Sequence, residues 1–307
     1  MVAAIIAITF FVYVWFRLPE LQVISRADRN SFLKVGKFAF SIFTYQTITS
    51  LLLIFERVYV LRTFGSEALT YYVVPLMLGI YLHAFIVSFS QVAVPEINER
   101  ITNRERLLAF YKLANKSVLA VTTLFISGYW VFGKAFLTLW LGNDFESRSF
   151  TLLVIHGTAF GIIAISINCW ILAEATHFSG LNALSASVTA LLAINVSWIA
   201  AAYYGMEGIA AGRLIGAIAV LPLIPLLEKK VFGNSMFLFW VDALARVVVA
   251  AGVSVLFARI AVSSLQWSWS NLLISTAMFA SCFVVILLLL RFRPGFELRE
   301  LDSDSRD

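Results

Sequence analysis

Charged residues are scarce in this sequence: 13% of the 307 residues are charged, whereas 61% are hydrophobic. A soluble domain usually carries about 25% charged residues, so the composition excludes an ordinary soluble fold. With 6 prolines and 16 glycines, the chain is not disordered or collagen-like. The two cysteines, Cys169 and Cys282, lie inside apolar stretches and form no Cys-x-x-Cys motif. We expect both to pack as small apolar groups.

Sequence motifs for catalysis are also missing. There is no GxxxxGK[ST] phosphate-binding loop, no HExxH, no GxSxG and no pair of carboxylates at catalytic spacing. The three histidines, His83, His156 and His177, are scattered along the chain, and we expect each to be a satisfied helix residue. The sequence therefore predicts no enzyme, no cofactor and no metal site.

Long apolar runs dominate what is present. A window of about 19 residues finds them at 2–16, 36–56, 70–94, 115–133, 151–173, 182–203, 207–227, 237–259 and 271–290. Most are about 20 residues long, the length at which a helix crosses a bilayer core. The predicted fold class is all-α, a multi-span helical membrane protein with about nine transmembrane helices.

The distribution of basic residues predicts the orientation. Sixteen of the 23 Lys and Arg residues fall in alternate loops and the C-terminal tail, and five fall in the opposite loops. The positive-inside rule places the richer side, with the C-terminus, in the cytoplasm. The net charge of +5 is therefore a signal of topology, and it requires no nucleic-acid partner. All eight Trp lie near span ends, as in an interfacial belt.

The second apolar run carries an unusually polar face. Gln46, Ser50 and Arg57 lie within about 40° of one another on a helix, and Tyr45 and Glu56 are neighbours of this group. Such a face either lines a hydrated cavity or packs on another helix. Arg57 and Arg213 either extend to the outer interface or present positive charge to an anionic substrate, because guanidinium pairs with phosphate in bidentate fashion.

Other polar residues inside the spans are expected to serve packing. Asp242 and Arg246, spaced i,i+4, should neutralise each other, whereas Asn168 and Glu174 are weaker cavity candidates. Small residues recur every four positions in two neighbouring runs, which predicts close helix–helix interfaces. These residues are Ser185, Thr189, Ala193, Ser197 and Ala201, followed by Gly208, Gly212 and Gly216.

Several short motifs, in order and spacing, resemble the polysaccharide-flippase (Wzx-like) branch of the MOP exporter superfamily. They are Glu56-Arg57, Gly65-Ser-Glu-Ala68 with Tyr71, Val94-Pro95-Glu96, Trp140-Leu-Gly-Asn-Asp-Phe145 and Tyr203-Tyr-Gly-Met-Glu-Gly208. Two positions depart from the family: Glu56 stands where Asp is more common, and Arg213 falls in a stretch that is usually apolar or small. The family has two six-helix lobes around a central cavity, often with two extra helices.

The resemblance implies a division of the chain. Residues 1–16 would be the last helix of a missing N-terminal lobe, 17–35 a basic cytoplasmic connector and 36–227 a six-helix membrane lobe. Residues 228–292 would be two additional transmembrane helices, and 293–307 a disordered cytoplasmic tail.

The function implied is the flipping of an undecaprenyl-pyrophosphate-linked oligosaccharide across the bacterial plasma membrane by alternating access. Arg57 and Arg213 would hold the pyrophosphate or an acidic sugar, with Glu56 beside them, and Gln46, Ser50 and Tyr45 would bond the glycan. The implied partners are this glycan lipid, membrane lipid, a coupling ion, and a missing lobe or a second copy. Alternatives are a multidrug or cation antiporter of the same superfamily, an inactive truncated remnant, and a membrane glycan polymerase or ligase.

Overall fold

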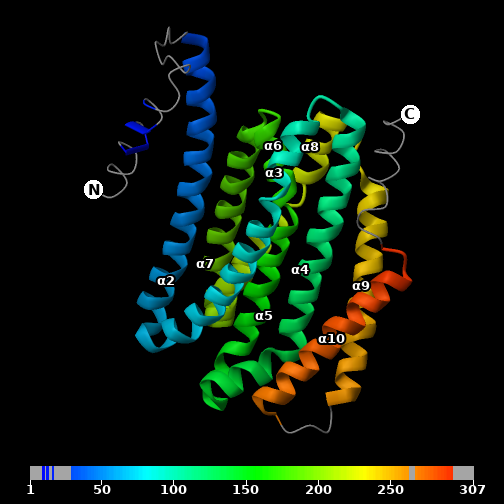
Figure 1. The fold of residues 1–307 in the computed structure, drawn as a ribbon. Helices are drawn as coiled ribbons and strands as arrows, with labels where there is room; N and C mark the ends of the chain where they lie inside the picture. The colour runs from blue at the N-terminus through cyan, green and yellow to red at the C-terminus, as the bar shows by residue number, and fades with distance from the viewer. Residues whose placement is uncertain (1–8, 11, 14–15, 17–28, 263–266, 293–307) are drawn as a thin grey trace. The chain divides into compact units, whose positions relative to one another are not determined.

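The computed structural model describes residues 9–10, 12–13, 16, 29–262 and 267–292. Across these ranges all the long elements are helices, and no strand occurs (Figure 1). The helices are α2 (Arg29–Ser90), α3 (Ala93–Arg100), α4 (Arg104–Leu141), α5 (Asn143–Ile165), α6 (Ile167–Ala175), α7 (Ser179–Ile218), α8 (Leu223–Phe232), α9 (Phe237–Val262) and α10 (Trp269–Leu289).

Two of these helices are bent at a glycine. Gly65 in α2 has φ 88° and ψ 179°, and Gly205 in α7 has φ 58° and ψ −134°. Side chains other than glycine rarely adopt such positive φ values. Figure 1 shows α2 turning back on itself at its bend. We refer to residues 41–64 and 66–90 as the first and second arms of α2, and to residues 179–204 and 206–218 as those of α7.

Six continuous helical segments in the described residues are long and apolar enough to cross a membrane. They are Val35–Ser90, Arg104–Leu141, Asn143–Ala175, Ser179–Phe232, Phe237–Ile260 and Trp269–Leu289. The chain is thus a multi-pass, all-helical membrane protein. The predicted count of about nine spans stays a prediction, because two of the six segments contain the glycine bends.

The predicted ends of the chain are tested only in small part. Most of the predicted span 1–16, residues 17–28 of the connector and the tail 293–307 lie outside the described residues. The helix α2 begins at Arg29, so residues 29–35, predicted as a loose connector, are helical.

The two arms of α7 pack directly on each other through the small residues that the four-residue spacing predicts to lie at helix–helix interfaces. A Cβ atom added at Gly212 would lie 2.6 Å from the Ala193 carbonyl oxygen, and one added at Gly216 would lie 2.7 Å from that of Thr189. The Ser197 hydroxyl donates to the Ile209 carbonyl at 2.9 Å. Both small-residue stripes are therefore helix–helix interfaces, and they face each other.

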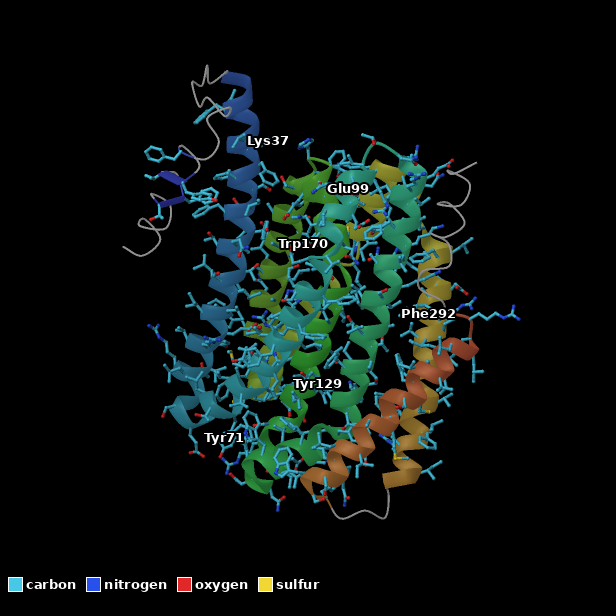
Figure 2. The ribbon with its side chains drawn as sticks, in the orientation of Figure 1. Lys37, Tyr71, Glu99, Tyr129, Trp170 and Phe292 are labelled. Atoms are coloured by element: carbon cyan, nitrogen blue, oxygen red, sulfur yellow. The ribbon has the colours of Figure 1, made fainter. Side chains whose placement is uncertain are left out.

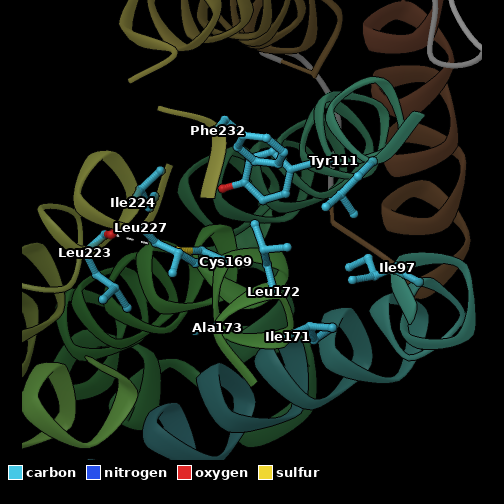
Figure 3. Close-up of a cluster of buried hydrophobic side chains, with 12 residues drawn as sticks. Ile97, Tyr111, Cys169, Ile171, Leu172, Ala173, Leu223, Ile224, Leu227 and Phe232 are labelled. Atoms are coloured by element: carbon cyan, nitrogen blue, oxygen red, sulfur yellow. Dashed lines mark hydrogen bonds between the residues drawn. The ribbon is translucent and has the colours of Figure 1, made fainter. Parts of the chain in front are cut away.

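A buried cluster joins α3, α4, α6 and α8 at one end of the bundle (Figure 3). Its members include Ile97, Tyr111, Leu172, Leu227 and Phe232. Cys169 is 1% exposed and packs among them, with its thiol 3.9 Å from the Leu223 carbonyl oxygen. The prediction that Cys169 packs as a small apolar group is confirmed.

The last two helices pack on α4 through two further apolar clusters, which include Leu119, Val247 and Phe283, and Phe132 and Phe279. In α9, Arg246 Nη2 donates to Asp242 Oδ1 at 2.8 Å. This confirms the predicted i,i+4 neutralisation of the two charges.

Candidate substrate-binding region

The polar residues predicted on the second apolar run lie on the first arm of α2, where they differ in burial. Gln46 and Ser50 are exposed, Tyr45 and Arg57 are half-buried, and Glu56 is fully buried. The face formed by Gln46, Ser50 and Arg57 is thus left open by the rest of the described chain. Of the two readings of this face, packing on another helix is not seen at Gln46 and Ser50 among the described residues.

Arg57 is a half-buried cation with unused hydrogen-bonding capacity. Its Nη2 donates to the Met77 sulfur at 3.4 Å, and its buried Nε has no hydrogen-bond partner. Within residues 29–262 and 267–292, no carboxylate forms an ion pair with it. Buried polar groups are normally bonded, so the guanidinium is available to an anion that the structure does not contain.

Glu56, the neighbour of Arg57 in sequence, points instead into the protein interior. Its Oε1 lies 2.9 Å from Arg213 Nε, and the side chains of Glu56 and Arg213 are 0% and 3% exposed. The Tyr72 hydroxyl donates to Glu56 Oε2 at 3.2 Å. The three residues come from the first arm of α2, the second arm of α7 and the second arm of α2, so this pair ties three helical segments together.

The surroundings of the Glu56–Arg213 pair are mostly apolar. Arg213 Cζ lies 4.9 Å from the centre of the Phe160 ring, close enough for a cation–π contact, and the Tyr72 ring meets His156 edge-on at 4.9 Å. Val60, Leu76, Leu152 and Ile209 fill the cluster around them. An unpaired charge in such a site is costly, so Glu56 and Arg213 each depend on the other.

Arg213 is therefore placed away from the open face that carries Arg57. It neither extends to an outer interface nor lines the same face as Gln46 and Ser50; it serves as the counter-ion of Glu56. The sequence reasoning missed this pair. The charges of Glu56 and Arg213 could have indicated it. An acid and an arginine that are each isolated in apolar spans, near the same end, are expected to neutralise each other.

Tyr45 forms a second polar contact between helices. Its hydroxyl donates to Glu174 Oε1 at 3.1 Å, and its ring meets that of Trp170 edge-on at 5.1 Å. The Asn168 amide instead donates to Asn115 Oδ1 at 3.5 Å, a buried contact with α4. Of the two weaker cavity candidates, Glu174 thus lies beside Tyr45, whereas Asn168 faces the interior of the bundle.

The prediction for the histidines is wrong at His156. This side chain is fully buried, and neither ring nitrogen has a hydrogen-bond partner. In the part of the chain that the structure describes, no group of three or more His, Cys, Asp and Glu side chains could hold a metal ion. The His156 ring packs edge-on against the ring of Tyr72.

Comparison with known proteins places the fold. No protein-family model and no curated protein matches the chain. Among solved structures, the chain is similar to the lipid II flippase MurJ in an inward closed conformation, with a TM-score of 0.67 and 12% sequence identity. The match covers 91% of this chain and 60% of that one, so the chain spans 60% of the length of the flippase structure. At 12% identity this likeness shows a shared fold, and it does not single out the polysaccharide-flippase branch.

Proposed function

We propose that this protein flips a lipid-linked oligosaccharide across the bacterial plasma membrane, with an undecaprenyl-pyrophosphate glycan as substrate. The observation that carries the proposal is the fold shared with MurJ over 91% of the chain. The half-buried Arg57, unpaired among the described residues, supplies the anion-binding group that such a substrate needs. The compared flippase is longer than this chain. We therefore propose that the functional transporter also contains a first helical lobe or a second copy of this chain.

The proposed topology separates the arms of the bent helices. The segments Val35–Ser90 and Ser179–Phe232 are 56 and 54 residues long, more than twice the roughly 20 residues that one crossing needs. Counting each arm as one crossing gives eight spans in the described residues, and the run at 2–16 would be the ninth. The bends at Gly65 and Gly205 then lie outside, and the basic loops and the C-terminus lie in the cytoplasm.

In this proposal the open face of the first arm of α2 meets the substrate. Arg57 holds the pyrophosphate, because a guanidinium forms two parallel charge-assisted bonds to phosphate oxygens. Gln46 and Ser50, exposed on the same face, bond hydroxyl groups of the glycan, and Tyr45 lies beside them at the Glu174 contact. The Glu56–Arg213 pair holds this arm in place through the change between inward and outward states that alternating access requires.

A multidrug or cation antiporter of the same superfamily is the second candidate, and the buried carboxylate of Glu56 is the observation that favours it. In an antiporter such a group would bind a cation inside the membrane. Here, however, Glu56 is already neutralised by Arg213 at 2.9 Å, and the exposed face carries the opposite charge at Arg57. The flippase is therefore the better supported function.

Native mass spectrometry of the purified protein with undecaprenyl pyrophosphate tests the role of Arg57. We expect Arg57→Ala to weaken this binding about 10–100-fold, because a hydrogen bond to a charged group contributes about 1.5–3 kcal/mol. The matched control is Arg62→Ala, one turn further along α2 at an exposed position. If both variants bind the lipid as the wild type does, Arg57 is not its ligand.

A further inference from the structure

A pocket of about 470 Å³ lies at the end of the bundle where α2 and α7 bend. Figure 2 shows Tyr71, one of its lining residues, at the opposite end of the bundle from Glu99. Gln46, Ser50 and Arg57 are not among the residues that line this pocket. The lining side chains that matter for its chemistry are Phe64, Glu67, Tyr71, Arg148, Tyr204 and Glu207.

Both helix bends shape this pocket. Phe64 and Tyr204 directly precede Gly65 and Gly205, the two residues with positive φ. A Cβ atom built at Gly205 would have a Phe64 ring carbon as its nearest neighbour, at 3.9 Å. The first turns of α5 complete the wall with Arg148. The pocket therefore depends on three segments that are far apart in the sequence.

One part of the wall carries a polar network of exposed side chains. Arg148 pairs with Glu67 at 3.2 Å and with Asp144 at 3.3 Å, and its Cζ lies 5.0 Å from the centre of the Tyr71 ring. The Tyr71 hydroxyl in turn donates to Asp144 Oδ2 at 3.0 Å. The charge of Arg148 is thus already balanced by Glu67 and Asp144, so it is a poor site for an additional anion.

The other part of the wall, formed by Tyr204 and Glu207, has polar groups that bind no other side chain among the described residues. The Tyr204 side chain is 70% exposed, and neither Tyr204 nor Glu207 has a hydrogen-bond or ion-pair partner in the described part of the chain. An aromatic face, a free carboxylate acceptor and a guanidinium donor line the same space. A pocket of this volume with a few convergent polar groups is typical of a small-ligand site.

We propose that this pocket binds a neutral sugar residue, with Tyr204 against the sugar face and Glu207 and Arg148 on its hydroxyl groups. Sugar hydroxyls both donate and accept, so they match a carboxylate, which only accepts, and a guanidinium, which only donates. Aromatic side chains offer an apolar face for the C–H side of the ring. Glu67, Glu207 and Arg148 together leave a net negative charge, which disfavours acidic sugars.

The identity of the natural ligand rests on the proposed function. If the chain flips a lipid-linked glycan, this pocket would receive the glycan after it has crossed, at the end away from the basic loops. The pyrophosphate group would bind Arg57 on the open face of α2, and a sugar of the glycan would bind in the pocket beside Tyr204. Two different parts of the substrate would therefore bind at two different sites.

The test measures sugar binding without lipid or transport. The purified full chain in nanodiscs is titrated with maltotetraose as the neutral probe and tetragalacturonate as the acidic probe, followed by saturation-transfer NMR. We expect the neutral probe to bind better than the acidic probe, and Tyr204→Ala and Glu207→Gln each to weaken it at least about fivefold. Tyr203→Ala is the matched control, because Tyr203 is 79% exposed and does not line the pocket.

Three outcomes would overturn the proposal: no binding of the neutral probe, tighter binding of the acidic probe, or an equal loss in Tyr203→Ala. Arg57→Ala separates this proposal from the proposed function, because it should leave maltotetraose binding unchanged while weakening undecaprenyl pyrophosphate. If the wild-type protein binds maltotetraose but not undecaprenyl pyrophosphate, the sugar pocket is supported and the proposed flippase function is contradicted. If it binds undecaprenyl pyrophosphate but not maltotetraose, the flippase function is supported and the sugar pocket is contradicted.

Discussion

Glu56 and Arg57 are adjacent in the sequence, yet the structure sends them to opposite environments. Glu56 is buried against Arg213, whereas Arg57 stays half-exposed beside Met77. Successive residues on a helix point about 100° apart, so one acid–arginine dipeptide can supply both an internal tie and an external charge. The first residue of the pair has a role in stability and the second, we propose, in binding.

The buried pair leads to a prediction about stability. Glu56→Ala leaves Arg213 as an uncompensated buried charge, and removing one partner of such a pair costs about 3–5 kcal/mol. The double variant Glu56→Leu/Arg213→Met removes both charges and should recover most of that loss. Unfolding of the detergent-solubilised protein measures both effects.

The exposed pair in α9 is the control for this measurement. Asp242→Ala breaks an ion pair whose side chains are 37% and 57% exposed, so we expect a loss of no more than about 1 kcal/mol. A double variant at Glu56 and Arg213 that is as unstable as the single variant would show that the pair is not the source of the effect.

At the residue scale, the sequence predicted which residues share a face of the helix better than it predicted the partners of the buried residues. The helical spacing of Gln46, Ser50 and Arg57 placed them on one side, and the structure leaves that side open. The partner of Glu56 lies 157 residues away, and no periodicity connects two such distant positions. Only the need for charge neutrality inside an apolar core could have linked them.

Among the elements, the two arms of α7 show how small residues decide packing. Their glycine and alanine stripes were predictable, because a four-residue repeat is the spacing of one helix face. That the two stripes pack on each other depends on the bend at Gly205, whose φ of 58° was not predictable from the spacing. The sequence thus predicted the interfaces, and the structure supplied their pairing.

This interface predicts that adding one methyl group lowers the stability of the protein at Gly212 in α7 but not at Gly252 in α9. At Gly212 a Cβ would overlap the Ser197 hydroxyl and the Ala193 carbonyl, so we expect Gly212→Ala to destabilise the protein by about 1–3 kcal/mol, as overpacking does. At Gly252 in α9 nothing lies within 4 Å of such an atom, and Gly252→Ala should be neutral or slightly stabilising. Thermal unfolding in detergent compares the two; equal effects would contradict the close packing of the α7 arms.

The molecule as a whole is defined by its bends and its basic loops. Two segments longer than 50 residues each bend at one glycine, Gly65 in α2 and Gly205 in α7. The all-helical, membrane-spanning class could be predicted from the sequence, because apolar length acts over whole segments. The pocket beside Tyr204 could not, because three segments distant in the sequence form its walls.

The topology predicts which loops a reagent can reach from outside the cell. Single cysteines are introduced at two exposed positions, Ser66 beside the bend of α2 and Thr102 between α3 and α4, in a variant in which Cys169 and Cys282 are replaced by alanine. Ser66→Cys should react with a membrane-impermeant maleimide in intact cells, and Thr102→Cys should react only after lysis. The opposite pattern would invert the proposed orientation.

The most direct test of the account is the rate at which a lipid-linked oligosaccharide reaches the outer leaflet, measured in vesicles that contain the protein as the cell makes it. The account predicts flipping well above that of empty vesicles, a loss of about tenfold or more in Arg57→Ala, and wild-type rates in the control Arg62→Ala. Wild-type flipping in Arg57→Ala would contradict the role of this residue. Flipping no faster than in empty vesicles would contradict the proposed function itself.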